Sequence, residues 1–115
     1  MSLRDLILND VPVAEVKPVT LRGEKLYVRE MNGTERDAYE AQQLSANKAG
    51  SGLENFRARL LVRVIVDKDG NRVFGDDDVA ALGKLPAREI RKAFDIASKL
   101  NALTPEDEAD LVKNS

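Results

Sequence analysis

The sequence predicts an α+β fold, in which a small antiparallel β-hairpin near the N-terminus is followed by a mainly α-helical body. Two observations predict this class. Apolar residues alternate with polar ones on either side of a glycine turn within residues 16–31, whereas later segments repeat apolar residues at helical spacing. The chain has 115 residues, 43% of them hydrophobic and 33% charged, which suits one folded globule. We therefore interpret residues 1–115 as a single domain.

The first twelve residues form a separate feature. Ser2 and Asp5 have the spacing of a helix capping box, and three apolar side chains recur on one side of the short helix that follows. These side chains are Leu3, Leu6 and Ile7. A helix this short is not stable alone in water, so it must dock on the body of the protein, a partner or another copy. We interpret residues 1–12 as a mobile N-terminal segment and these three side chains as candidate partner-binding residues.

The hairpin occupies residues 16–31. Val19 and Leu21 alternate with polar residues on one arm, and the other arm has the same pattern. Arg22-Gly23-Glu24 is expected to form the turn, because glycine readily adopts the positive φ that a tight hairpin turn needs. Pro18 lacks an amide hydrogen, which places its arm at the edge of the sheet.

A helix is expected after the hairpin. Asn32-Gly33 ends the sheet, and the cap pattern Thr34-x-x-Asp37 begins a helix that should run to about Ala46. Its apolar side is thin and consists of Ala38, Tyr39, Ala41 and Leu44.

The next helix is the best candidate for the centre of the core. The pattern Ser51-x-x-Glu54 is expected to cap it, and its apolar residues keep helical spacing. These residues are Leu53, Phe56, Leu60, Leu61 and Val64. Residues 62–66 are rich in β-branched side chains, which leaves a strand open as an alternative at that end.

The C-terminal half predicts further helices. The acidic residues 76–78 suit the start of a short helix, and Pro86 suits the first turn of another. This later helix carries Ile90, Ala93, Phe94, Ala97 and Leu100 on one face. Thr104-Pro105 combines a cap with a proline at the first helical position, so residues 104–115 are expected to form a short C-terminal helix or tail. From the helical faces we expect Phe56, Leu60, Ile90 and Phe94 to be buried.

The composition argues against most enzyme classes. The chain has no Cys and no His, which excludes thiol nucleophiles, Cys-ligated zinc and a Ser-His-Asp triad, and removes the commonest general base. Its neighbouring carboxylates lie at expected turns and helix starts, where acidic residues have structural roles. We therefore predict that the protein is not an enzyme and uses no cofactor.

Residues 67–78, DKDGNRVFGDDD, resemble a calcium-binding loop. The oxygen-bearing residues at loop positions one, three, five and twelve are Asp67, Asp69, Asn71 and Asp78. The sixth position must be glycine for the sharp turn of an EF-hand, but here it is Arg72, whose charge would also repel the metal. We favour a tight turn followed by helix-capping acids, and we predict no metal site.

Seven basic residues raise the question of nucleic-acid binding. They are Arg57, Arg59, Arg63, Arg88, Arg91, Lys92 and Lys99. The net charge is −2 and there are only three Phe and two Tyr with no Trp, which argues against a nucleic-acid surface. We favour a solvated face paired with Glu54, Glu89 and Asp95. No stretch reaches the ~18 apolar residues that span a bilayer, so we expect a cytoplasmic protein that does not bind membranes.

Several motifs together point to a known family. They are Tyr27-Val28-Arg29-Glu30-Met31, Thr34-Glu35-Arg36-Asp37-Ala38-Tyr39, Val66-Asp67-x-Asp69-Gly70-x-Arg72-x-Phe74 leading into Asp76 to Asp78, Leu85-Pro86 to Leu100-Asn101, and Lys113-Asn114. In this combination the chain, from about Val16 onward, resembles the tail assembly chaperones of long-tailed, siphovirus-type bacteriophages or prophages.

The resemblance implies a small protein of the bacterial cytoplasm that acts before the virion is finished and is absent from the mature particle. Such proteins bind the tape measure protein and help to recruit the tail tube subunit, the major tail protein. Many members are also made in a longer form by a ribosomal frameshift. The resemblance brings no catalytic residue and leaves a homo-oligomer open. The alternative is a structural head–tail or tail-completion protein of a phage, but these are commonly β-rich, whereas this chain is mostly helical.

Overall fold

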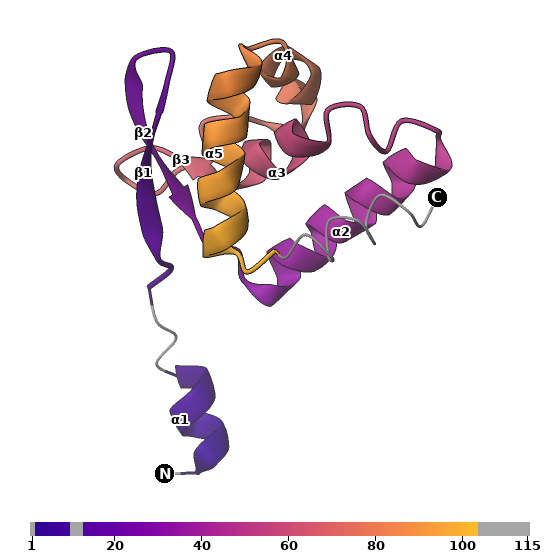
Figure 1. Cartoon of the computed structure of the whole chain (residues 1–115). Coiled ribbons are helices and arrows are strands. Elements are labelled where there is room, and N and C mark those ends of the chain that lie inside the picture. Colours follow the sequence, from indigo (N-terminus) through magenta and orange to yellow (C-terminus); the bar gives the residue numbers. More distant parts are fainter. Residues whose placement is uncertain (1, 10–12, 104–115) are drawn as a thin grey trace.

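The computed structural model describes residues 2–9 and 13–103 (Figure 1). In chain order its elements are α1 (Leu3–Asn9), β1 (Val16–Leu21), β2 (Glu24–Arg29), α2 (Gly33–Lys48), α3 (Phe56–Val64), β3 (Ile65–Val66), the 3-10 helix η1 (Asp76–Asp78), α4 (Val79–Gly83) and α5 (Ala87–Leu100). The predicted α+β class is confirmed, because β1 and β2 form a hairpin near the N-terminus and the body that follows is mostly helical. The helix or tail expected at residues 104–115 lies outside the described residues.

The sheet has three antiparallel strands in the order β1-β2-β3. Arg22 and Gly23 make the turn of the hairpin with φ of 52° and 81°, the two left-handed conformations of a type I′ turn. Pro18 lies on the edge strand β1, as its missing amide predicts. Val28 of β2 pairs with Ile65 of β3, and both side chains are buried. The β-branched end of the predicted core helix therefore leaves the helix and joins the sheet.

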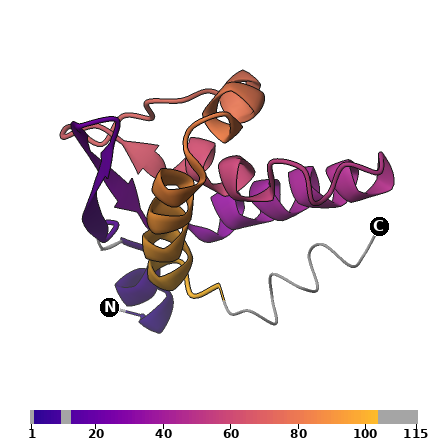
Figure 2. The same cartoon turned by 45° about the horizontal axis from the view of Figure 1, so that its top comes forward.

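The core lies where α5 packs between the hairpin and α3, an arrangement seen in Figures 1 and 2. Phe56, Leu60, Ile90 and Phe94 are all buried, which confirms the prediction from helical spacing. The rings of Phe56 and Phe94 lie 5.8 Å apart between centroids, tilted by 52°. Nearly every residue of α3 is buried, so α3 is the central helix that its sequence predicted.

The predicted cap of α2 is wrong, and of its predicted apolar side only Tyr39 is buried. Asn32, rather than Thr34, is the N-cap: its Oδ1 accepts a hydrogen bond from the Glu35 backbone N–H at 2.9 Å, and the Glu35 carboxylate accepts one from the Asn32 N–H at 3.0 Å. This reciprocal arrangement satisfies two helix-end donors at once. The buried face of α2 consists of Tyr39, Gln43 and Asn47, whereas Ala38, Ala41 and Leu44 are exposed.

The start of α3 also differs from the sequence prediction. The helix begins at Phe56, and its N-cap Asn55 has a left-handed φ of 58°, which interrupts helical geometry upstream. Residues 51–54 therefore form a loop instead of a first helical turn. The Ser51 hydroxyl donates a hydrogen bond back to a carbonyl of α2 at 3.3 Å, and Leu53, expected on the core face, is 77% exposed.

Candidate partner-binding surfaces

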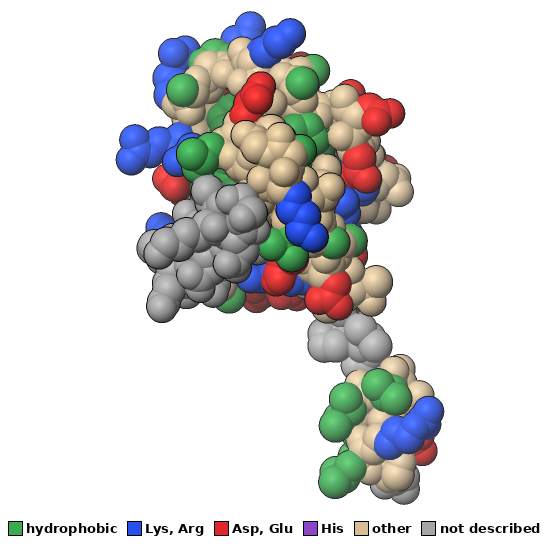
Figure 3. All heavy atoms as spheres, turned by 90° about the vertical axis from the view of Figure 1, so that its right-hand side faces the viewer, with side chains coloured by type: hydrophobic (Ala, Val, Ile, Leu, Met, Phe, Trp, Pro, Cys, Tyr) green, Lys and Arg blue, Asp and Glu red, His purple; other side chains and the backbone are tan. Residues whose placement is uncertain are grey.

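The helix α1 presents all three predicted partner-binding side chains to solvent. Leu3, Leu6 and Ile7 are 78%, 54% and 72% exposed, and no residue of α1 is buried. Figure 3 shows this helix apart from the rest of the molecule, with apolar side chains on its surface. Leu8 is exposed as well. Because burial of apolar side chains is the main source of helix stability in proteins, α1 gains little stability from the described part of the chain.

The polar contacts of α1 are local. The Asp5 backbone N–H donates to the Ser2 hydroxyl at 3.2 Å, which confirms the predicted cap. Arg4 and Asp5 form an ion pair at 3.0 Å, and both side chains are well exposed, so the pair contributes little stability. The Ser2 cap therefore stabilises the start of this helix, while its apolar side chains remain exposed and available to contact a partner.

Arg59 is a structural residue rather than part of a basic surface. It is 6% exposed. One end of its guanidinium donates to the carbonyl oxygens of Ser51 and Glu54, both at 2.6 Å. The other end donates to the Gly52 carbonyl at 3.2 Å and to the Gln43 side chain at 3.0 Å. Burial lowers the pKa of Arg59 from its ordinary value through desolvation. The prediction that Arg59 belongs to a solvated face is therefore wrong, because Arg59 is buried and binds backbone carbonyls of the 51–54 loop.

Two further members of the predicted basic and acidic set also hold the fold together. Arg63 donates to the Gln42 side chain at 3.0 Å and forms an ion pair with Asp76 at 3.7 Å, joining α3 to α2 and η1. Glu89 of α5 accepts a hydrogen bond at 2.7 Å from the backbone N–H of Arg22 in the hairpin turn. These contacts fasten separate elements to one another, so Arg63 and Glu89 are not available as a continuous surface.

Three of the remaining basic side chains line a groove between α3 and α5. Its volume is about 650 Å³. The apolar residues that line it include Leu53, Phe56, Leu85, Ile90, Phe94 and Leu103. Arg57, Arg91 and Lys99 are exposed beside these residues, and Arg88 and Lys92 lie on the neighbouring surface of α5. The sequence showed the basic residues but not the groove, because Leu53 and Phe56 are brought to α5 from a distant part of the chain.

The first acidic residue of the 67–78 segment, Asp67, stabilises a turn. The Asp67 carboxylate accepts hydrogen bonds from the backbone N–H groups of Asp69 at 2.9 Å and Asn71 at 3.0 Å. The backbone hydrogen bond from Asn71 is the main reason why the pKa of Asp67 lies below its usual value. Across the part of the chain that the structure describes, no group of three or more His, Cys, Asp or Glu side chains is placed to hold a metal ion.

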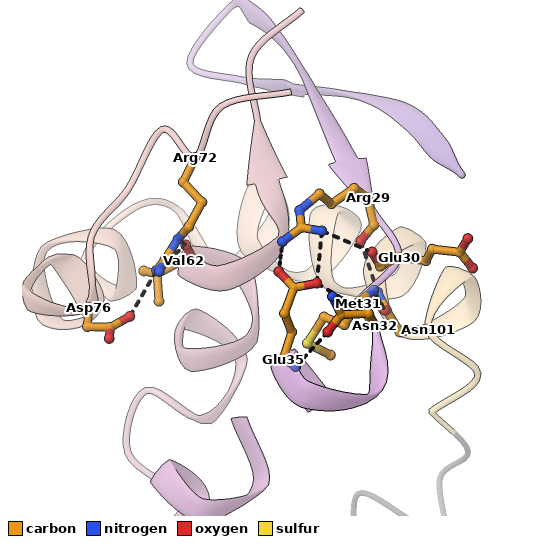
Figure 4. A network of polar contacts seen from close by, with 9 residues as sticks. All are labelled: Arg29, Glu30, Met31, Asn32, Glu35, Val62, Arg72, Asp76 and Asn101. Carbon is orange, nitrogen blue, oxygen red and sulfur yellow. Dashed lines mark hydrogen bonds and ion pairs between the residues drawn. The ribbon is translucent and has the colours of Figure 1, made fainter. Parts of the chain in front are cut away.

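Arg72, at the position where an EF-hand needs glycine, ties this turn to the core. Its guanidinium donates to the Val62 carbonyl at 3.1 Å and 2.9 Å and to the Asp76 carboxylate at 2.9 Å, as Figure 4 shows. The hydrogen bond from Arg72 holds the pKa of Asp76 below its usual value. Arg72 therefore joins the segment after this turn to the end of α3 and to η1.

A second polar network, also in Figure 4, joins the end of α5 to the start of α2. The Asn101 side chain accepts a hydrogen bond from the Met31 backbone N–H at 2.6 Å and donates to the carbonyls of Arg29 at 3.3 Å and Ala97 at 2.9 Å. The Arg29 guanidinium forms an ion pair with Glu35, which also caps α2. The motif residues in these two networks thus have structural roles. The candidate partner-binding surfaces are α1 and the groove.

A family model described as phage tail assembly chaperone matches residues 2–113. This chain belongs to that family. No curated protein and no solved structure matches it significantly.

Membership assigns this tail assembly chaperone to a family of assembly proteins rather than enzymes, with phage tail proteins as partners. Among its described residues, no helix combines the length and hydropathy needed to cross a membrane.

Proposed function

We propose that this tail assembly chaperone binds the phage tape measure protein and helps to recruit the major tail protein, the tail tube subunit, while the tail is built in the host cytoplasm. The family match supports a role in tail assembly. The observation that carries the binding proposal is α1, which offers Leu3, Leu6 and Ile7 to a partner instead of to its own core. A very long client rich in amphipathic helices would present matching apolar stripes.

The contact is of the helix-in-groove type, in which apolar residues one turn apart insert between those of the client. Fully burying an aliphatic side chain is favourable by about 1.5–3 kcal/mol, from which the cost of association must be subtracted. A surface of three such side chains gives a weak contact that can be released when tail subunits arrive. Repetition along a long client strengthens the overall association without making any one contact permanent.

Co-expression tests this proposal. The tape measure protein is produced with and without the chaperone, and the soluble and pelleted fractions are compared. We expect the client to be soluble and to co-purify only when the chaperone is present. Equal solubility in both cultures, with no co-purification, would overturn the function.

A surface variant locates the contact. We expect Leu3→Ser combined with Leu6→Ser and Ile7→Ser to abolish rescue of the client. The matched control replaces three exposed apolar residues elsewhere in the described structure, Val13, Leu44 and Val73, by Ser. If the α1 variant rescues the client as well as the control does, the function stands but α1 is not the contact surface.

The product of the gene provides a separate test. Lys113 and Asn114, which lie outside the described residues, can be encoded by an A-rich run of the kind on which ribosomes slip. We propose a slippery heptamer in the last codons and an overlapping frame that extends the protein. The coding sequence and the masses of the products check this. A gene without either feature would contradict the longer form.

Purified virions distinguish the chaperone from a structural head–tail or tail-completion protein. We expect mass spectrometry to find this chain in infected cells but not in finished particles. Its presence in stoichiometric amounts in the virion would favour the structural alternative. A very long, helix-rich reading frame directly downstream would support the chaperone.

A further inference from the structure

The groove between α3 and α5 has an apolar floor of largely buried side chains, with more exposed residues at its edge. Phe56 and Phe94 form a ring pair within it, and Ile90 and Leu103 are buried beside them. Leu53, in contrast, stands at the edge with most of its surface exposed. The groove volume of about 650 Å³ lies in the ~300–1,000 Å³ range of ligand-binding clefts.

The charged residues that line the groove are mostly basic. Arg57, Arg91 and Lys99 are exposed there, and among the described residues that line the groove Asp95 is the one acid. The surface beside it adds Arg88 and Lys92. This local excess contrasts with the chain's net charge of −2. The Arg57 guanidinium lies 5.5 Å from the centre of the Phe94 ring, so it is already held over the groove.

We propose that this groove binds an amphipathic helix that carries acidic residues beside its apolar stripe. The inference rests on the proposed function in taking the helix to be a segment of the tail client, but it concerns a surface separate from α1. The apolar stripe would contact Leu53 and the floor, and the carboxylates would pair with Arg91 and Lys99 on the rim. A nucleic acid fits less well, because the floor is apolar and only its margin is basic.

A designed peptide tests the chemistry of the groove. The probe is a labelled helical peptide of roughly 18 residues with Leu at positions i, i+3, i+4 and i+7 and Glu on both flanks. A second peptide has Lys in place of every Glu. With the full-length protein, we expect fluorescence anisotropy to show about tenfold tighter binding of the Glu peptide, and this preference should shrink as salt is raised.

Variants of the rim and the edge supply the decisive comparison. We expect Arg91→Glu with Lys99→Glu to weaken binding of the Glu peptide by about tenfold, and Leu53→Ser to weaken both peptides. The matched control is Lys48→Glu with Lys68→Glu, which makes the same change in charge at two exposed residues that do not line the groove. Thermal unfolding verifies that each variant is folded. Equal binding of the two peptides, or an unchanged affinity in the folded rim variant, would overturn the proposal.

Other possible occupants of the groove would give different results, and each of these results would overturn the proposal. The chain's own acidic segment would be the occupant if the peptide bound only after Glu106→Gln, Asp107→Asn, Glu108→Gln and Asp110→Asn. A second copy would be the occupant if the rim variant turned an oligomer into a monomer in sedimentation. A single-stranded oligonucleotide that bound the wild type but not the rim variant would indicate nucleic acid.

The proposed function is tested independently of this surface. The triple Ser variant of α1 should leave peptide binding unchanged. If the rim variant loses the peptide yet still rescues the client, the groove is not the site of a client helix, and this inference fails while the proposed function stands. Failure of rescue by the wild type would overturn the proposed function instead.

Discussion

Asn101 accepts a hydrogen bond from the backbone N–H of Met31 through its side-chain oxygen, 2.6 Å away, although the two residues are separated by 70 positions in the chain. The same side chain donates to the Arg29 carbonyl, and the Asn101 backbone carbonyl accepts from the Arg36 guanidinium at 2.8 Å. One buried asparagine therefore connects the end of α5 with the end of β2 and the start of α2. The three elements meet at this residue.

Replacing Asn101 should destabilise the fold. Asn101→Ala removes the acceptor of the Met31 N–H, and a partly buried polar group left without its partner costs about 1–3 kcal/mol. Urea unfolding followed by circular dichroism measures the change. Asn9→Ala, at an exposed position of α1, is the control and should change stability by less than about 0.5 kcal/mol. Equal stability of the two variants would show that the Asn101 bonds are not important for the fold.

Arg59 should not be replaceable by lysine. The planar guanidinium reaches three loop carbonyls and Gln43 at once, whereas a lysine ammonium presents its donors from a single atom. We expect Arg59→Lys to cost about 2–4 kcal/mol in the free energy of unfolding. Arg88→Lys, on the exposed side of α5, serves as the control with little change. A small loss for Arg59→Lys would mean that the 51–54 loop is held by other contacts.

The aromatic pair in the core gives a third prediction. Phe94→Ala should cost about 3–5 kcal/mol, because it leaves a cavity beside Phe56. This is a large part of the ~5–15 kcal/mol that stabilises a typical domain. Phe94→Leu, which keeps most of the volume, should cost less, and so should Phe74→Ala at a half-buried position. A shift of less than ~1 kcal/mol in Phe94→Ala would contradict the assigned core.

Acid should weaken the contact between Arg72 and Asp76. The pKa of Asp76 in the folded protein lies below the ordinary value of 3.8. Its stabilising contribution is therefore fully present above about pH 3.8 and is lost as the pH falls from there through the lowered folded pKa. Because Asp76 is exposed, the contribution is at most about 1 kcal/mol.

Comparison of two neighbouring variants isolates this effect. We expect Asp76→Asn to be less stable than the wild type at pH 6, and the difference in free energy of unfolding to shrink at the acid end. Asp77→Asn, also in η1 but with no ion pair to Arg72, corrects for the loss of charge at the start of the helix. Parallel pH profiles of the two variants would argue against a specific role of the Arg72–Asp76 pair.

Calcium should not bind at residues 67–78. Asp67 already accepts two backbone hydrogen bonds, and Arg72 places a cation against Asp76. Titration calorimetry with millimolar calcium should show no saturable heat. A dissociation constant below about 10⁻⁴ M would contradict this expectation.

The features predicted correctly are encoded by neighbouring residues. The hairpin follows from the Arg22-Gly23 turn and the alternation around it, and the faces of α3 and α5 follow from apolar residues three and four positions apart. The Ser2 cap and the apolar side of α1 are equally local. Each depends on backbone geometry and side-chain periodicity within a few residues, so a short stretch of sequence contains the necessary information.

Which polar residues are buried, and where the surface forms a groove, could be determined only from the tertiary structure. The inward face of α2 is polar because Gln43 meets Arg59, sixteen residues later, and α3 starts late where Arg59 binds the preceding loop. A buried polar group is tolerated only when distant parts of the chain bring it partners, and no local pattern contains them. Arg63 and Arg91 look equivalent in the sequence. In the folded chain, Arg63 contacts α2 and η1, whereas Arg91 stays exposed beside an apolar groove. Their roles differ because folding brings polar partners to Arg63 and apolar residues to the surroundings of Arg91.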